Sequence, residues 1–293
     1  MRAAAPFVLA CLVGGLLAGC GGRAAQRPAT TVSTVRKPPP AGLRVGVVGD
    51  LSIRVPGAVI VHGTLGALAA DPLVLVVAAS AAARSLPTVA AANPPSHFVL
   101  VGGSVRGVHQ KNLAGLVLRH ADAARLGGAV AGLTAAEQES INARVAWVGP
   151  LERGLVNPFV HGVHDTAPGA TVLRAGAPNS PAACKEAALG AFARGAIVVM
   201  ARGGACGAAA AAGAHQQNHP ALVLSDFELP AVAAALIVRD AVAGMYHGGE
   251  DLVYGAASGA VAVRALDPRI SAATAVRARD AAQQLAGGQP PSG

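Results

Sequence analysis

The chain has 293 residues, of which 53% are hydrophobic and 3% aromatic, and its 23 Lys and Arg against 15 Asp and Glu give a net charge of +8 at pH 7. Five of the basic residues precede Leu43, so the rest of the chain holds 18 basic and 15 acidic residues and is only mildly basic. The chain has no basic stripe interleaved with aromatic residues, which argues against a nucleic-acid-binding role. Its length suits two lobes, or one large domain, with an ample core.

The first segment predicts a secretory signal. A short apolar run, Ala3 to Gly19, follows the single positive residue Arg2 and is too short for a comfortable transmembrane helix. It ends in Leu17-Ala18-Gly19-Cys20, which resembles a bacterial lipobox. We therefore expect removal of residues 1–19 and lipidation of Cys20, palmitate included, on the extracytoplasmic face of the cell membrane. The alternative is a soluble secreted protein with a chance cysteine near its cleavage site.

Residues 20–42 predict an extended, flexible tether. They show no apolar periodicity, include three consecutive prolines at 38–40, and carry Arg23, Arg27, Arg36 and Lys37 with no acid. We expect such a basic tether to lie near anionic lipid headgroups.

From Leu43 onward, near-continuous apolar runs ending in Gly or Asp alternate with Ala-rich stretches. Such runs are typical of parallel strands buried on both faces, so the pattern predicts an α/β chain with parallel sheets. The expected strands cover residues 43–48, 73–77, 97–101, 114–118, 144–148, 171–173, 196–200 and 221–224. The expected helices cover residues 80–92, 121–133, 158–166, 182–194, 208–215 and 229–246.

Cys184 and Cys206 are the two cysteines that follow Cys20. In an oxidising compartment an isolated pair usually bonds. Each opens an expected helix at the carboxyl edge of a parallel sheet, in neighbouring units, so the two can approach within disulfide distance. The alternative is two separate buried thiols.

Open α/β sheets bind ligands at the carboxyl edge of their strands. The glycine pairs there allow backbone N–H groups to approach a ligand next to positive helix ends. The residues expected at this edge are Asp50, Gly102 to Ser104, His120, Asp122, Gly149 to Arg153, Gly203, Gly204, Ser225 and Asp226.

The search for catalytic motifs is negative. The chain has no GxSxG elbow, HExxH, Walker loop or CxxC, so we expect no enzyme activity and no cofactor. His161 and His164 are spaced to share a helix face, but without a nearby third ligand a solvated face is favoured over a metal site. For His120 and Asp122 a surface pair is favoured. Trp147 lies in a strand and is either core or a stacking platform for a planar ring.

Six stretches between Pro94 and Leu266 resemble, in order, the basic membrane protein family of bacterial lipoproteins. They are PPSHFVLVGG, NLAGLVLRHADAARLGGAVAGL, NARVAWVGPLERGLVNPFVHGVHDTAPGATVL, ARGGACGAAAAAGA, RDAVAGMYHGG and VYGAASGAVAV. Phe159 and Gly162 stand at the family's Phe and Gly spacing. The family consists of solute-binding receptors, many of them for purine nucleosides, that feed ABC importers.

The resemblance implies an α/β fold of two Rossmann-like lobes with parallel sheets, the type I periplasmic-binding-protein architecture. Residues 43–117 plus 229–247 would form the first lobe, and residues 118–228 plus 248–293 the second. A small-molecule solute would bind in the interlobe cleft and pass to an ABC permease.

The chain departs from this family at the ligand site. The acidic loop and Ser-Phe-Asn helix start after the first strand are absent, and the family's acid run and aromatic become Arg119 to Asp122 and Arg125. Only 24 residues separate Val48 from Leu73, so the first lobe is predicted to have lost a helix and to be the less stable lobe. Asp226 is the candidate for the Asp that bonds sugar hydroxyls, although its alignment is open. The candidate ligand residues are Asp50, Asp122, Trp147, Gly149, Arg153, Gly203, Gly204 and Asp226.

Two functions follow from these matches and departures. The first is a membrane-anchored receptor that delivers a nucleoside-like or other small solute to an ABC importer. The second is a degenerate binding-protein scaffold that acts through protein contacts at the cell surface without transport. A cleft lined by Asp50, Arg153 and Asp226 would favour the first function, and a collapsed cleft with an exposed apolar patch the second.

Overall fold

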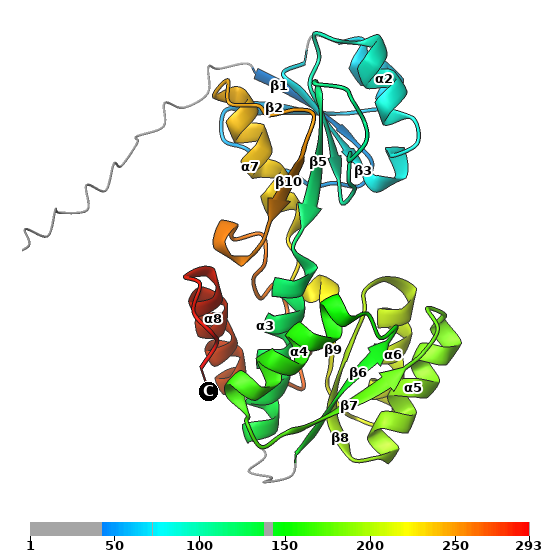
Figure 1. The fold of residues 1–293 in the computed structure, drawn as a ribbon, viewed down its shortest axis with the longest axis vertical. Helices are drawn as coiled ribbons and strands as arrows, with labels where there is room; N and C mark the ends of the chain where they lie inside the picture. The colour runs from blue at the N-terminus through cyan, green and yellow to red at the C-terminus, as the bar shows by residue number, and fades with distance from the viewer. Residues whose placement is uncertain (1–42, 72, 138–142, 293) are drawn as a thin grey trace, which may run out of the picture. The chain divides into compact units, whose positions relative to one another are not determined.

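The computed structural model describes residues 43–71, 73–137 and 143–292, which build two β-sheets (Figure 1). The predicted signal segment 1–19, the lipidation site Cys20 and the tether 20–42 lie outside the described residues. In the part of the chain that the structure describes, no helix combines the length and the apolar character needed to cross a membrane.

The first sheet has six strands in the order β10-β5-β4-β3-β1-β2, and every neighbouring pair is parallel. Its strands are β1 (Leu43–Val48), β2 (Ala58–His62), β3 (Leu75–Ala79), β4 (Phe98–Val101), β5 (Leu113–Leu118) and β10 (Asp251–Tyr254). The position of β10 corrects the sequence analysis, which placed residues 248–254 with the second lobe. Asp251 lies opposite Gly115 of β5, and Leu252 and Tyr254 pack on the core of the first sheet.

The helices that cover the first sheet are few and mostly short. On one face α7 (Pro230–Val242) packs Ile237 and Val238 against Val45 and Leu75. The other face is covered by α1 (Leu65–Ala69), α2 (Leu86–Ala92) and the 3₁₀ turn η1 (Ser80–Ala82).

Two of the crossovers in this sheet contain no helix. Residues 49–57 and 102–112, both fully described, run as loops between β1 and β2 and between β4 and β5. Ile53 and Val105 are the buried apolar side chains that these loops add to the core. The second loop is fixed by the shielded Asp251 carboxylate, which accepts the Ser104 hydroxyl (2.6 Å) and the Val105 N–H (2.7 Å).

The second sheet has four parallel strands in the order β7-β6-β8-β9. They are β6 (Arg144–Gly149), β7 (Thr171–Gly176), β8 (Ala196–Ala201) and β9 (Ala221–Val223). Side chains alternate between two cores, so Val145 packs with α3 (His120–Glu137) and α4 (Arg153–Thr166), and Ala146 packs with α5 (Pro181–Ala193) and α6 (Gly204–Gln216). The helix α8 (Ala272–Ala286) adds to the first of these cores and was missed by the sequence analysis.

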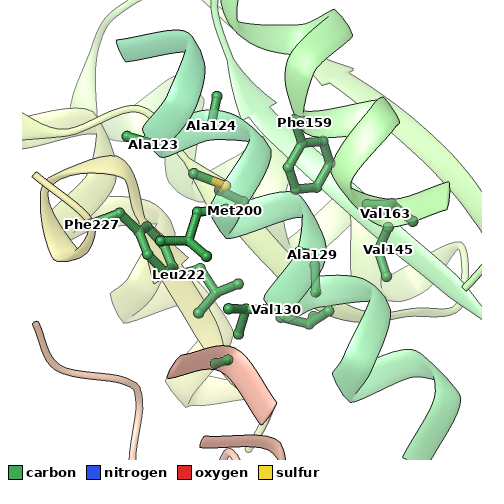
Figure 2. Close-up of a cluster of buried hydrophobic side chains, with 14 of the residues drawn as sticks. Ala123, Ala124, Ala129, Val130, Val145, Phe159, Val163, Met200, Leu222 and Phe227 are labelled. Carbon is green, nitrogen blue, oxygen red and sulfur yellow. The ribbon is translucent and has the colours of Figure 1, made fainter. Parts of the chain in front are cut away.

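Glycines allow α3 and α4 to pack at close range. A β-carbon on Gly128 would lie 2.1 Å from the Phe159 carbonyl oxygen, and one on Gly162 would lie 1.9 Å from the Arg125 carbonyl oxygen. In Figure 2, Phe159 lies on one side of α3, and Met200 and Phe227 lie on the other, so that α3 is buried along most of its length. This packing holds α4, and therefore the residues at its start, firmly against the second sheet.

Three crossing segments connect the two sheets. They are residues 118–120 between β5 and α3, residues 224–230, which include the turn η2 (Leu224–Asp226), and residues 254–262, which include the turn η3 (Ala256–Ser258). Hydrogen bonds tie them together: Arg119 N–H donates to the Tyr254 carbonyl (2.7 Å), and Leu229 N–H donates to the Ala260 carbonyl (2.8 Å). Glu228 and Val261 form an antiparallel bridge.

Candidate functional site

A cavity of about 200 Å³ lies at the carboxyl end of the second sheet, next to the crossing segments. Glu152 follows β6, Arg202 follows β8 and Leu224 follows β9, so three neighbouring strands deliver residues to it. This is the edge at which parallel α/β sheets bind ligands. The cavity is lined by His120, Glu152, Leu155, Arg202, Gly203, Leu224 and Glu228.

Two ion pairs supply the polar part of the lining. The Arg202 guanidinium pairs with the Glu152 carboxylate, and His120 Nδ1 pairs with Glu228 Oε1. The His120 side chain is 54% exposed, whereas that of Glu228 is only 15% exposed. The hydrogen bond to Glu228 raises the pKa of His120, burial opposes that effect, and the more distant Arg202 lowers the pKa while Glu152 raises it. The two pairs therefore act on each other electrostatically.

The apolar part of the lining is aliphatic. Leu155 and Leu224 are both buried, and they belong to the core below α3 and α4. Among the residues that the structure describes, no Phe, Tyr or Trp ring lines the cavity, and the imidazole of His120 is the aromatic ring in its lining. Trp147, Phe159 and Phe227 are each fully buried in the core.

The start of α6 borders the cavity at Gly203, its N-cap residue. No side chain caps this helix, and its first turn has no acidic residue. Its first N–H groups therefore have no side-chain acceptor, and they give this end of the helix a partial positive charge beside Arg202.

A disulfide between Cys184 and Cys206 joins the first turns of α5 and α6, with their Cα atoms 5.4 Å apart. Gly149, at the end of β6, has φ +119, and a β-carbon there would lie 3.3 Å from the Cys206 sulfur. A glycine is needed at this position because the chain turns in the left-handed region directly against the disulfide.

Of the predicted ligand residues, the structure places Gly203 in the lining. Gly149 and Gly204 flank it near the disulfide, and Gly204 has φ +73. Arg153, the first residue of α4, is exposed and lies outside the lining, and Asp50 is exposed after β1 in the first sheet. The cleft lined by Asp50, Arg153 and Asp226 that the sequence analysis considered is therefore not the cavity found here.

Three other predicted residues serve the fold. Asp122 accepts the Ala256 N–H (3.0 Å), which ties the start of α3 to the third crossing segment. Asp226 accepts the Val223 N–H (2.9 Å) within its own turn, and burial raises the pKa of its carboxyl. Trp147 is buried, and its indole N–H donates to the Pro150 carbonyl (3.1 Å), so it cannot stack on a ligand.

The histidines singled out in the sequence lie on two helices, His120 at the start of α3 and the other two on α4. His161 and His164 are exposed on α4, and His120 pairs with Glu228 rather than with Asp122. Within residues 43–71, 73–137 and 143–292, no three His, Cys, Asp or Glu side chains gather in an arrangement suited to a metal ion.

Glu152 lies within the stretch Gly149 to Arg153 that was predicted at the sheet edge but was not named as a ligand residue, and Arg202 and Glu228 were not predicted there. Each is a charged residue just after an apolar strand or turn, which is the signal that identified Asp226 and Asp50. What the sequence does not show is which charged side chains face one another across that edge.

Neither a protein-family model nor a curated protein sequence matches the chain. Solved structures do. An ABC transporter system solute-binding protein from Conexibacter woesei is 17% identical, with a TM-score of 0.59 over 84% of this chain and 97% of that one. A transcriptional activator of the comK gene from Bacillus halodurans is 16% identical, with a TM-score of 0.59 over 85% of this chain and 100% of that one.

These likenesses concern the fold. Together with the two parallel sheets, they confirm the predicted class, an α/β fold of the periplasmic-binding-protein type. The two neighbours carry different names on one architecture, so the function has to be argued from the site.

Proposed function

We propose that this chain is a solute-binding protein that delivers a small solute to an ABC importer. The observation that supports it most is the charged cavity at the carboxyl end of the second sheet, to which two of the crossing segments contribute His120, Leu224 and Glu228. A solute bound there contacts side chains of the second sheet and of the crossing segments together. The solute-binding protein from Conexibacter woesei shares the fold over nearly its whole length.

The same proposal includes membrane anchoring through Cys20. Its support is the sequence of the first 20 residues, with an apolar run that ends in Leu-Ala-Gly-Cys. Labelling of expressing cells with radioactive palmitate should mark the wild-type chain and not the Cys20→Ala variant. Equal labelling of the two chains would reject Cys20 as the anchor.

The resemblance to the basic membrane protein family implies a purine nucleoside as the solute, and this stays a prediction. The described lining offers a purine ring no Phe, Tyr or Trp side chain for stacking, and the His120 imidazole there is paired with Glu228. We therefore do not restrict the proposal to nucleosides.

A second candidate is a scaffold that acts through protein contacts and carries no solute. It is kept because the same fold, at the same TM-score, occurs in a protein named as a transcriptional activator and not as a solute-binding protein.

Thermal melts of the full chain with nucleosides, bases, sugars and amino acids separate the two candidates. A solute present at 100 times its dissociation constant should stabilise a competent protein by about 2.7 kcal/mol, which is visible as a shifted melt. Cooperative melting without a shift for any compound would reject the solute-binding role and favour the scaffold.

A further inference from the structure

The shielded carboxylates of this protein differ in how many hydrogen-bond donors they have. Asp267, whose side chain is 3% exposed, accepts bonds from the His215 ring (2.7 Å) and from the N–H groups of Ala221 (3.1 Å) and Arg269 (2.9 Å). Asp251, 6% exposed, accepts the Ser104 hydroxyl and the Val105 N–H, and it pairs with Arg106. Shielded carboxylates need such donors because burial removes their water.

Glu228 has fewer hydrogen-bond donors than these two carboxylates. Its side chain is 15% exposed, and the described residues give it one side-chain partner, the ring of His120. An ionised carboxylate can accept about four hydrogen bonds. Glu228 lines the cavity, so its remaining acceptor capacity is available to whatever occupies that space.

A positively charged side chain lines the same cavity. Arg202 lines it next to Gly203, at the start of α6, where no side chain caps the helix. Arg202 is 40% exposed and its partner Glu152 is 46% exposed. Exposed pairs of this kind hold together weakly, so a ligand anion can replace Glu152 on Arg202 at little cost.

The volume of the cavity narrows the choice of ligand further. A cavity of about 200 Å³ is smaller than the roughly 300–1,000 Å³ of pockets that hold drug-sized ligands. The cavity is lined by an anionic group, Glu228, and by a cationic group, Arg202, so a ligand with a single charge is attracted by one of them and repelled by the other. A ligand that carries a positive and a negative charge can pair with both groups.

We propose that the solute is a small zwitterion of the amino-acid type, with its protonated amine on Glu228 and its carboxylate at Arg202 and the start of α6. This rests on the solute-binding role proposed above. A polyol or a nucleoside would leave His120 in place on Glu228, whereas an ammonium group competes with His120 for that carboxylate.

The competition has a measurable consequence. The charged groups that act on His120 are Glu228, Arg202 and Glu152. Once the ligand amine takes Glu228, His120 loses the partner that raised its pKa, and it releases its proton to the buffer. Binding of the zwitterion should therefore strengthen as the pH rises from 6 to 8, because less protonated His120 competes.

Calorimetric titration of the full chain tests this directly. The probes are glycine, alanine and 4-aminobutyrate, with acetate, ethylamine, glucose and adenosine as comparisons. At pH 7 we expect a zwitterion to bind with an enthalpy that differs between phosphate and Tris buffers, since a proton is released. Acetate and ethylamine should bind more weakly than the zwitterion.

Three variants complete the test. Glu228→Gln should weaken zwitterion binding by about 10- to 100-fold, the loss of one charge-assisted bond. The matched control Glu186→Gln changes an exposed carboxylate on α5 and should leave the affinity unchanged. His120→Gln should abolish the buffer dependence and strengthen binding at pH 6, an effect opposite to that of a merely damaged site.

The outcomes separate this inference from the proposed function. Binding of glucose or adenosine, but of no zwitterion, overturns the inference and leaves the solute-binding role standing. Zwitterion binding without proton release, or with Glu228→Gln unaffected, overturns the placement of the amine on Glu228. No binding by any probe or by the wider melting panel overturns both.

Discussion

The six-stranded and the four-stranded sheet are both parallel, but different residues shield them from water. The second sheet is covered by α3, α4, α5 and α6, helices of 13 to 18 residues that are locked by close glycine contacts and by a disulfide. The first sheet has one helix of similar length, α7, and is otherwise covered by helices of 5 and 7 residues and by two loops. In one of those loops, a carboxylate rather than a helix fixes the chain.

The difference bears on where the site is built. Glu152 and Arg202 stand at the starts of α4 and α6, on the better-packed sheet, so the cavity is formed on elements that hold side chains in place. The thinner cover of the first sheet should open at a lower free energy.

Removal of the disulfide should have the largest effect. A loop closed over a sequence separation of 22 residues is worth about 3 kcal/mol of stability in the chain-entropy model. The double variant Cys184→Ala, Cys206→Ala should therefore lose about that much free energy of unfolding in urea. If it unfolds like wild type, the disulfide does not account for the better-held second sheet.

The substitution Gly162→Ala tests the close packing of α3 and α4. The new β-carbon would lie 1.9 Å from a backbone oxygen, so the helices must separate. We expect a loss of about 2 kcal/mol in denaturant unfolding, in the range for an overpacked core. Gly190→Ala in α5 is the matched control, since nothing lies within 4 Å of its β-carbon, and it should stabilise by about 0.5–1 kcal/mol.

Hydrogen exchange compares the two sheets directly. Amides of β3, an interior strand of the first sheet, should exchange about tenfold faster than those of β6, an interior strand of the second, equivalent to about 1.4 kcal/mol less opening free energy. Equal protection throughout both sheets would contradict the view that a thinner cover makes the first sheet easier to open.

The smallest expected effect is the pH dependence of the tie between His120 and Glu228. Since the pKa of His120 is raised in the folded state, its stabilisation is complete below the ordinary value of 6.5 and is lost as the pH rises through the folded value. The half-exposed ring limits this to less than about 1 kcal/mol. Melting temperatures of the wild-type chain should fall between pH 6 and pH 9, and those of the His120→Gln variant should not show this fall. Parallel curves for the two proteins would show that the pair of His120 and Glu228 does not stabilise the fold.

Much of the fold could be predicted from local sequence. Strands β1, β6 and β8 are apolar runs long enough to identify, and their expected bounds agree with the structure within a residue. The strand β2 and helix α1 were not predicted, because they occupy the short interval before Leu73, for which the loss of a helix was predicted. Helix α8 was missed since its buried face is mostly alanine, which gives little hydrophobic periodicity.

The site was harder to predict, for a geometric reason. Asp226 and Glu228 are two residues apart and chemically alike, yet the turn η2 directs Asp226 back to Val223 and leaves Glu228 at the cavity. A three-residue turn decides which carboxylate is available, and composition gives no sign of it. Trp147 was weighed as core or ligand platform, and the alternation of side chains along β6 places it in the core.

The pairing of β10 with β5 has a consequence for synthesis on the ribosome. All four strands of the second sheet have been synthesised once residue 223 is added, whereas the first sheet still lacks α7 and the edge strand β10, which ends at residue 254. At the usual rate of translation, roughly 10 s pass between the synthesis of β5 and that of β10, and during this time the edge of β5 has no partner strand. A nascent chain stalled in that interval presents an unpaired strand and an uncovered apolar face, which are the features that chaperones and proteases recognise.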